Sequence, residues 1–333
     1  MFACEVPVTL QRQDVCFYFP QGSYRSLKSD LDVMEKEEPF AIVSEDLADL
    51  AGRIKSDFPE SISFYNSLLL HARGHARAYT FYTLKAAPHS HVAMWCHSLR
   101  DEDSQKASDT WLALHCRKEE VVLLKAALKQ THLINWEGRL CVYHVPEYMK
   151  SAVQEVARVR AGQELDAVRC CTFAYQPRQE EPVRCSAGLQ VYRLGRKGVR
   201  HMLDTSKFDK QKNFDEMMHL VRNAPSAGVY EDASVESETV VDVAVLPFGP
   251  EEETPLAWIT TSFYGGLAIL MTEERHRGRG LAKLVTQVAA RMLVGQGYVP
   301  HAHAEAKNVP SVKMFKTLPG WQEIHGVYFM HRE

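Results

Sequence analysis

The residues best suited to chemistry lie in a short basic loop, Arg275-His-Arg-Gly-Arg-Gly280. An apolar run precedes this loop and an amphipathic run follows it, so the predicted order is strand, loop, helix. Glycine lets the backbone approach an anion closely, and the first backbone amides of a helix have no acceptor within the helix. The loop therefore predicts a phosphate site at the beginning of a helix.

Two other phosphate-binding loops do not fit these residues. No Gly-Lys-Ser or Gly-Lys-Thr ends the loop, as a Walker A loop requires, and the glycine spacing differs from that of a Rossmann fingerprint. A basic surface turn between a strand and a helix is the simpler alternative. The loop alone leaves that alternative open.

A second segment further along the chain also follows a predicted strand and begins a predicted helix. Its sequence is Asn308-Val-Pro-Ser311-Val-Lys-Met-Phe315. Asn308 is placed to cap a helix that has Pro310 in its first turn. Together the two segments resemble the pyrophosphate loop and the later Asn-x-x-Ser segment of the GCN5-related N-acyltransferases. The resemblance implies an acyl-CoA site in a V-shaped opening between two central strands.

The resemblance also implies which residues would hold acyl-CoA, the expected co-substrate. The pyrophosphate would lie on the loop and the pantetheine along the strand before it. The first turns of the helix after Asn308 would line the far side. The predicted acyl-CoA contacts are Leu270, Met271, Thr272, Arg275, Arg277, Gly278, Arg279, Gly280, Leu281, Asn308, Ser311 and Phe315.

Within that superfamily the chain is most similar to the glycine N-acyltransferase family, which is also called FR47-like. Pro255-Leu-Ala-Trp258 and the turn Tyr264-Gly-Gly266 match that family in order, and His303-Ala-Glu305 matches its strand end. The resemblance covers most of residues 115–333 and is strongest in the last third. It implies transfer of an acyl group from CoA to the amine of an amino acid, glycine-like, or of another small amine.

The expected general base is missing from its place in this pattern. An ammonium must lose a proton before its nitrogen can attack a thioester. In glycine N-acyltransferases a Glu follows the turn before the central strand, but here Gly266 stands there, and Phe315 replaces a general-acid Tyr. Glu305 and His303 share a strand face and become the candidate catalytic residues. Proton relay by water, or a catalytically weak CoA-binding protein, remains an alternative.

The helices and strands that position these residues predict an α+β fold with a mixed sheet. The resemblance to the GCN5-related N-acyltransferases implies the same fold class. We expect a divergent α+β domain over residues 1–165 and an acyl-CoA-binding domain over residues 166–333, and we find no internal sequence repeat. Apolar patterning predicts helices over 44–58, 118–129, 147–159, 208–222 and 281–294. It predicts strands over 77–84, 91–96, 110–115, 139–144, 167–175, 189–193, 240–246, 256–262, 266–271, 298–304 and 321–330.

Composition narrows the possible partners. A net charge of −3 over 333 residues gives no general attraction to nucleic acid. No apolar run reaches the roughly 18 residues of a membrane helix. The 8 cysteines are irregularly spaced, which favours reduced thiols in an intracellular protein. We expect small-molecule partners only, acyl-CoA and an amine, a monomeric chain, and either the cytoplasm or mitochondria, which the resemblance suggests.

Histidine is frequent, with 15 residues in the chain. The group in the first third shows neither the tight spacing of zinc ligands nor an accompanying carboxylate pattern. The sequence therefore predicts no metal site. The residues considered are His71, His75, His89, His91 and His97.

Overall fold

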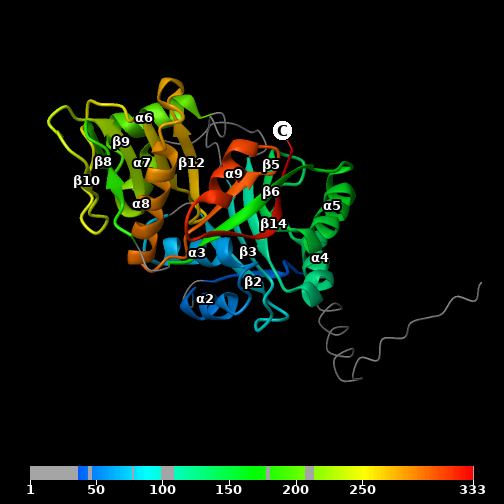
Figure 1. Ribbon diagram of the computed structural model, residues 1–333. Coiled ribbons are helices and arrows are strands. Elements are labelled where there is room, and N and C mark those ends of the chain that lie inside the picture. The colour runs from blue at the N-terminus through cyan, green and yellow to red at the C-terminus, as the bar shows by residue number, and fades with distance from the viewer. Residues whose placement is uncertain are drawn as a thin grey trace, which may run out of the picture.

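The chain folds around one large mixed sheet with helices on its faces (Figure 1). The computed structural model describes residues 37–43, 47–76, 79–98, 109–177, 181–206 and 214–332. Within these ranges the sheet has 12 strands, and the predicted mixed-sheet fold is confirmed. A second sheet joins only β7 (Arg184–Cys185) and β10 (Thr239–Val240). No helix in these ranges is both long and apolar enough to cross a lipid bilayer.

The first half of the sheet follows the order strand, two helices, three strands, helix, strand, helix, strand. A short 3-10 helix, η1 (Lys118–Glu120), precedes the third helix. The elements are β1 (Phe40–Ile42), α2 (Leu47–Lys55), α3 (Ile62–Ala72), β2 (Thr80–Leu84), β3 (Ala93–Ser98), β4 (Thr110–His115), α4 (Val121–Gln130), β5 (Leu140–Pro146), α5 (Glu147–Ala161) and β6 (Asp166–Tyr175).

The second half repeats this order of elements, again with a 3-10 helix, η2 (Glu274–His276), before its third helix. Its elements are β8 (Leu189–Tyr192), α6 (Arg196–Thr205), α7 (Phe214–Asn223), β9 (Ser226–Glu231), β11 (Ala257–Thr261), β12 (Leu267–Thr272), α8 (Leu281–Gly295), β13 (His301–Glu305), α9 (Val309–Thr317) and β14 (Trp321–Arg332). The repeat is one of structure without a visible sequence repeat, because many sequences of suitable volume and pattern satisfy the same packing.

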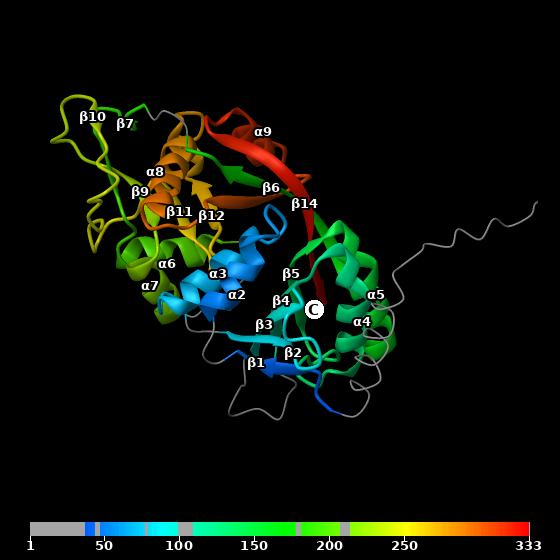
Figure 2. The same cartoon turned by 90° about the horizontal axis from the view of Figure 1, so that it is seen from below.

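The two halves exchange their last strands. The sheet order is β1-β2-β3-β4-β5-β14-β6-β13-β12-β11-β9-β8, so β14 pairs with β5 and β6 pairs with β13. The exchanged strands also pair with each other, from Trp321↔Tyr175 to His331↔Asp166. Figure 2 shows β14, in red, running from α9 across to the first half. Each half therefore completes its part of the sheet with a strand of the other half. The division into two domains at residue 165 stays a prediction.

The buried side chains form two clusters that also cross between the halves. One contains Phe64 and Leu68 of α3 together with Val285 of α8. The other contains Val142 of β5 and Met330 of β14, both 0 % exposed. Side-chain packing therefore links the halves in addition to the strand exchange.

Three differences from the predicted elements have local causes. The sequence does not predict α3, because its buried residues include Ser63, Asn66 and Ser67 beside apolar ones, so burial does not follow an apolar stripe. The strand predicted over 240–246 is wrong, since only Thr239–Val240 pairs there and bends follow. The helix predicted over 208–222 is confirmed from Phe214 onward, and its first six residues lie outside the described ranges.

Because the halves share strands, we expect the whole chain to unfold in one transition. In a variant with Trp95, Trp111 and Trp136 replaced by Phe, fluorescence reports the second half. In a variant with Trp258 and Trp321 replaced, it reports the first. Within each variant, the urea midpoint from fluorescence should coincide with that from far-UV circular dichroism. Separate midpoints would show that the halves unfold independently.

Candidate functional site

The two central parallel strands of the second half separate. β12 and β13 pair only at Leu267↔Ala302, and the rest of β12 is partly exposed. The equivalent strands of the first half, β4 and β5, stay paired from Thr110↔Leu140 to Ala113↔Tyr143. Of the two halves, only the second therefore leaves a strand edge open between its central strands.

A bulge sets the course of β12 along this edge. Ile269 has φ 52°, an uncommon value for a β-branched residue, and the register between β11 and β12 shifts at the same point. Beyond the bulge lie Leu270, Met271 and Thr272, the residues predicted to follow the pantetheine. The Thr272 Oγ1 atom is buried and has no hydrogen-bond partner within the described residues. A polar ligand along β12 would supply one.

The glycine loop joins β12 to α8 as the sequence predicts. Gly278 and Gly280 have φ values of 78° and 80°, and a Cβ at either would meet no heavy atom within 4 Å. Left-handed backbone, rather than crowding, therefore makes glycine the favoured residue at both positions. The Leu284 amide is the first to bond one turn back, to the Gly280 carbonyl at 3.1 Å. The earlier amides of α8 have no acceptor within the helix.

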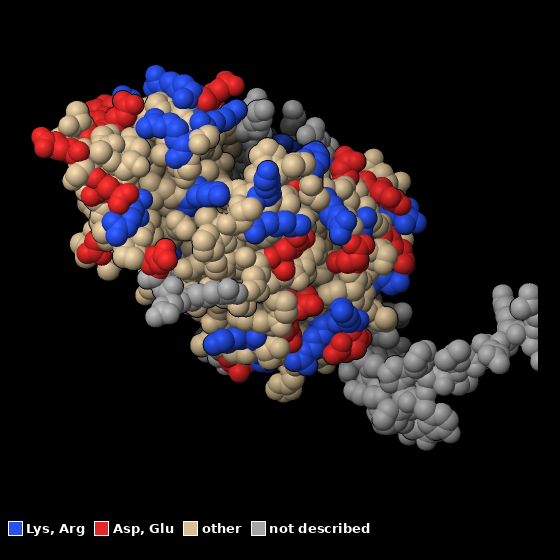
Figure 3. All heavy atoms as spheres, viewed as in Figure 1, with Lys and Arg blue, Asp and Glu red and all other residues tan. Residues whose placement is uncertain are grey.

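The loop is also basic and open to solvent. Arg275 and Arg277 are exposed, while Arg279 Nη1 lies 2.7 Å from His276 Nδ1. In Figure 3, Lys and Arg side chains gather around the region where Figure 1 shows β12 and α8. At the start of the loop, the Glu273 carboxylate lies 2.6 Å from the ring of His201 in α6. The loop thus presents positive charge and free amides together, which suits a phosphate.

The segment after β13 has the predicted cap. Asn308 Oδ1 accepts a hydrogen bond from the Ser311 amide at 3.3 Å, at the start of α9. Phe315 is buried, and its ring stacks on Phe173 with centroids 5.1 Å apart. Phe315 therefore belongs to the core between α9 and β6. Contact of Asn308, Ser311 or Phe315 with acyl-CoA stays a prediction.

The equivalent loop of the first half lacks the features of a phosphate site. It runs from His115 through Arg117 and η1 directly into α4, without a glycine. Glu119 and Glu120 stand there instead, and the Glu120 carboxylate accepts a hydrogen bond from the Arg117 amide at 3.1 Å. Two carboxylates would repel a phosphate. The halves therefore share a fold and differ in chemistry.

The space beside Gly266, where a Glu side chain is expected, is filled by another residue. A Cβ there would lie 2.8 Å from His301 Nε2 and 2.8 Å from Tyr264 Cε2. His301 is 0 % exposed and is held on both ring nitrogens. The ring of His301 therefore fills the space that a side chain at position 266 would enter.

A chain of hydrogen bonds runs from His301 to the predicted residue His303. Ser63 Oγ, from α3 of the first half, lies 3.0 Å from His301 Nε2 and 2.9 Å from His303 Nε2. Thr172 Oγ1 lies 3.0 Å from His303 Nδ1, and His301 Nδ1 lies 3.1 Å from the Val299 carbonyl. That carbonyl can only accept. Asn66 Nδ2 also lies 3.2 Å from His301 Nδ1, but its two hydrogens go to the carbonyls of Gly265 and Val299. We therefore assign the hydrogen of His301 to Nδ1, and the Ser63 hydroxyl donates to Nε2.

Burial favours the neutral form of both imidazoles. Burial lowers the pKa of His301 to about 4. Burial, with the neighbouring rings of His144 and His301, also holds the pKa of His303 well below its ordinary value. His144 stacks on His303 with centroids 4.6 Å apart. A neutral imidazole can accept a proton, as the expected base must, and the lowered pKa makes each ring a weaker base than an exposed histidine.

The structure thus joins one predicted catalytic residue to others that sequence reasoning missed. Glu305 lies on the same face of β13 as His303, but its carboxylate lies 3.2 Å from Lys307 Nζ. His301 could have been found from the alternation His-Ala-His-Ala-Glu. Ser63 could not, because it lies 238 residues from His301 in sequence.

The contact between Gly266 and His301 predicts a non-additive pair of substitutions. Gly266→Ala should lower the free energy of unfolding by about 1–3 kcal/mol, because its methyl group overlaps a fixed ring. In the double variant Gly266→Ala, His301→Ala the overlap with the imidazole is gone and only the contact with Tyr264 remains, so the loss should be smaller than the sum of the single losses. Gly295→Ala is the control, since a Cβ there meets nothing within 4 Å. Additive losses in urea denaturation would contradict this account.

One family model matches part of the chain. Residues 250–330 match the family model described as FR47-like protein. That range includes the glycine loop, α8, β13 and α9. No curated protein matches the chain.

Solved structures support the fold. A Drosophila protein of known structure matches with a TM-score of 0.68 and 16% identity, over 89% of this chain and 99% of that one. A GCN5-related N-acetyltransferase from Sphaerobacter thermophilus matches with a TM-score of 0.48 and 12% identity, over 88% and 95% of the two chains. One from Kribbella flavida matches with a TM-score of 0.46 and 14% identity, over 82% and 96%. The chain is therefore similar in fold to the Drosophila protein and is similar to FR47-like proteins over residues 250–330.

Proposed function

We propose that this protein is an acyl-CoA-dependent N-acyltransferase. The observation that carries the proposal is the separation of β12 from β13, which leads directly to a basic glycine loop at the beginning of α8. An extended thioester with a pyrophosphate at one end fits such an arrangement. The FR47-like match over residues 250–330 supports the same reading.

Acyl-CoA would bind with its pyrophosphate on the amides between Gly278 and Leu281, where the helix dipole also favours negative charge. The open edge of β12 offers backbone N–H and C=O groups to the amides of the pantetheine, as a neighbouring strand would use them. The thioester would then lie toward Ile269 and Gly266. This direction brings it to the face of the sheet that carries His303.

The proposed reaction is direct transfer to an amine. The neutral nitrogen attacks the thioester carbon, a C–N bond forms, the C–S bond breaks, and the CoA thiolate takes up a proton. The amine loses one proton to a base. Holding both substrates in one place supplies a large part of the rate, because the reaction becomes effectively unimolecular.

We assign the role of base to His303. It is only partly buried, whereas Ser63 and His301 are buried. Both of its nitrogens face hydroxyl groups: Ser63, whose hydrogen points to His301, accepts from Nε2, and Thr172 can turn from donating to accepting when Nδ1 gains a proton. His301 would act as a positioning residue, since it holds Ser63 and occupies the space beside Gly266.

The acceptor is proposed to be the amine of an amino acid, with glycine tested first. The similarity of the turn Tyr264-Gly-Gly266 and of His303-Ala-Glu305 to the glycine N-acyltransferase pattern supports this choice. The cytoplasm and mitochondria remain the proposed compartments.

The first test is binding followed by turnover. The purified chain should bind acyl-CoA in calorimetry and release free CoA, detected with a thiol reagent, when glycine or other small amines are added. Gly280→Ala should weaken acyl-CoA binding at least about tenfold, because alanine disfavours the left-handed backbone of the loop. Gly295→Ala, a glycine of α8 without positive φ, should bind like the wild type.

Two results would change the proposal. Absence of acyl-CoA binding would overturn it. Binding without CoA release, across a panel of acyl chains and amines, would favour a catalytically weak CoA-binding protein.

The role of His303 has its own test. His303→Ala should lower kcat by about 10²–10⁴-fold, the usual contribution of a general base, while acyl-CoA affinity stays unchanged. His303→Gln keeps the hydrogen bonds without basicity and should be equally slow. Val159→Ala is a control at an exposed position of α5, in the other half. An equal loss of acyl-CoA affinity in His303→Ala would point to a structural role.

A further inference from the structure

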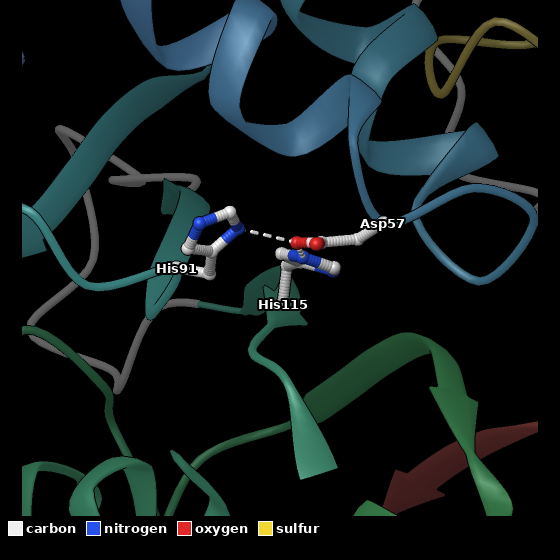
Figure 4. Close-up of side chains that lie close together, drawn as sticks. All are labelled: Asp57, His91 and His115. Carbon is white, nitrogen blue, oxygen red and sulfur yellow. Dashed lines mark hydrogen bonds and ion pairs between the residues drawn. The ribbon is translucent and has the colours of Figure 1, made fainter. Parts of the chain in front are cut away.

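A second cluster of titratable side chains lies in the first half of the fold. Asp57 stands in the turn between α2 and α3, His91 stands before β3, and His115 ends β4 (Figure 4). One carboxylate oxygen, Asp57 Oδ2, lies 2.5 Å from His91 Nδ1 and 2.9 Å from His115 Nε2. The side chains are 9%, 11% and 3% exposed, respectively. Three segments far apart in sequence therefore direct potential metal ligands to one buried point.

Neighbouring groups hold the cluster in place. Arg117 Nε donates to the other carboxylate oxygen, Asp57 Oδ1, at 2.8 Å. Glu120 accepts from the backbone amides of His91, at 3.0 Å, and of Arg117, at 3.1 Å. Oδ1 is thus occupied, and Oδ2 is the oxygen that faces both rings. Outer groups that fix a carboxylate in this way are usual around protein-bound metals.

The carboxylate is also paired with a fixed positive charge, because the Arg117 guanidinium lies 2.8 Å from Oδ1. A charged oxygen and two imidazole nitrogens therefore lie together, with all three ligand atoms within 4.8 Å of one another.

We propose that Asp57, His91 and His115 bind one divalent transition-metal ion, and that zinc suits this ligand set best. Two imidazole nitrogens and one carboxylate oxygen are a common zinc set, with water completing the tetrahedron. His91 would bind through Nδ1 and His115 through Nε2, and each ring would carry its hydrogen on the other nitrogen. The ion would replace the present hydrogen bonds to Oδ2 and tie the α2–α3 turn to the ends of β3 and β4.

In the structural repeat, the cluster lies at the position equivalent to the glycine loop. His115 ends β4, as Thr272 ends β12 in the second half, so the cluster lies at the strand end that carries the glycine loop in the other half. That end binds an anion in our proposed function, and here it would bind a cation. The absence of a metal site, predicted from local histidine spacing, is revised by this proposal. Asp57 lies 34 residues from His91 and 58 from His115, so no local pattern reveals the set.

Zinc binding by the full chain tests the proposal. The purified protein is treated with EDTA, exchanged into buffer without chelator, and titrated with Zn²⁺ in a calorimeter. One ion per chain should bind, and elemental analysis after gel filtration should find it retained. His91→Gln and Asp57→Asn, which keep side-chain size, should each weaken that binding at least about tenfold. Co²⁺ should give visible absorption bands in the wild type and not in these variants.

A matched control separates this site from adventitious binding, because the chain has 15 histidines. His89 is exposed and lies two residues before His91, so His89→Ala should keep the one-ion stoichiometry. Circular dichroism in EDTA shows whether each variant is folded, and zinc should raise the Tm of the wild type and of His89→Ala only. A wild type that retains no zinc, and whose Tm ignores EDTA, would mean that the cluster is an ion pair and would overturn the proposal. Equal zinc affinity in His91→Gln and His89→Ala would also overturn it.

Discussion

The side-chain amide of Asn66 holds the closed end of the two strands on which the site depends. It is 0 % exposed, and its Nδ2 donates to the Val299 carbonyl at 2.7 Å and to the Gly265 carbonyl at 3.1 Å. Its Oδ1 accepts from the Val299 amide at 3.2 Å. One buried residue thus joins the turn before β12 to the chain that enters β13, and the strands diverge from that point. Gly265 has φ 75°, and a Cβ there would lie 2.4 Å from Asn66 Cβ, so this approach requires glycine.

Asn66 belongs to α3, a helix of the other half, and this origin shapes the site. The same helix brings Ser63 to the imidazoles of β13. The first half has its own central strands and its own loop, but its central strands stay paired. It packs against the second half and contributes side chains to it. The exchanged strands β6 and β14 hold the halves in register, so a polar group from one can be positioned against the other within hydrogen-bond distance.

The two halves show how one fold carries unlike chemistry. After β12, Gly278 and Gly280 turn the backbone left-handed and leave amides free at the start of α8. After β4, the chain passes through η1 into α4, and the Glu120 carboxylate accepts hydrogen bonds from the amides of His91 and Arg117. Strand separation and loop composition therefore differ together between the two halves.

Local features of the sequence determined the glycine loop, the cap at Asn308, and most strands and helices of the second half. Positive φ at glycine and the bond from Asn308 to the Ser311 amide depend on residues only a few positions apart. The exchange of β6 and β14, the ring of His301 in the space beside Gly266, the reach of Ser63 and Asn66, and the meeting of Asp57 with two imidazoles were decided only by the tertiary structure. Each joins residues from tens to hundreds of positions apart, and such contacts leave no period or spacing in a single sequence, because they arise only when whole elements pack against one another.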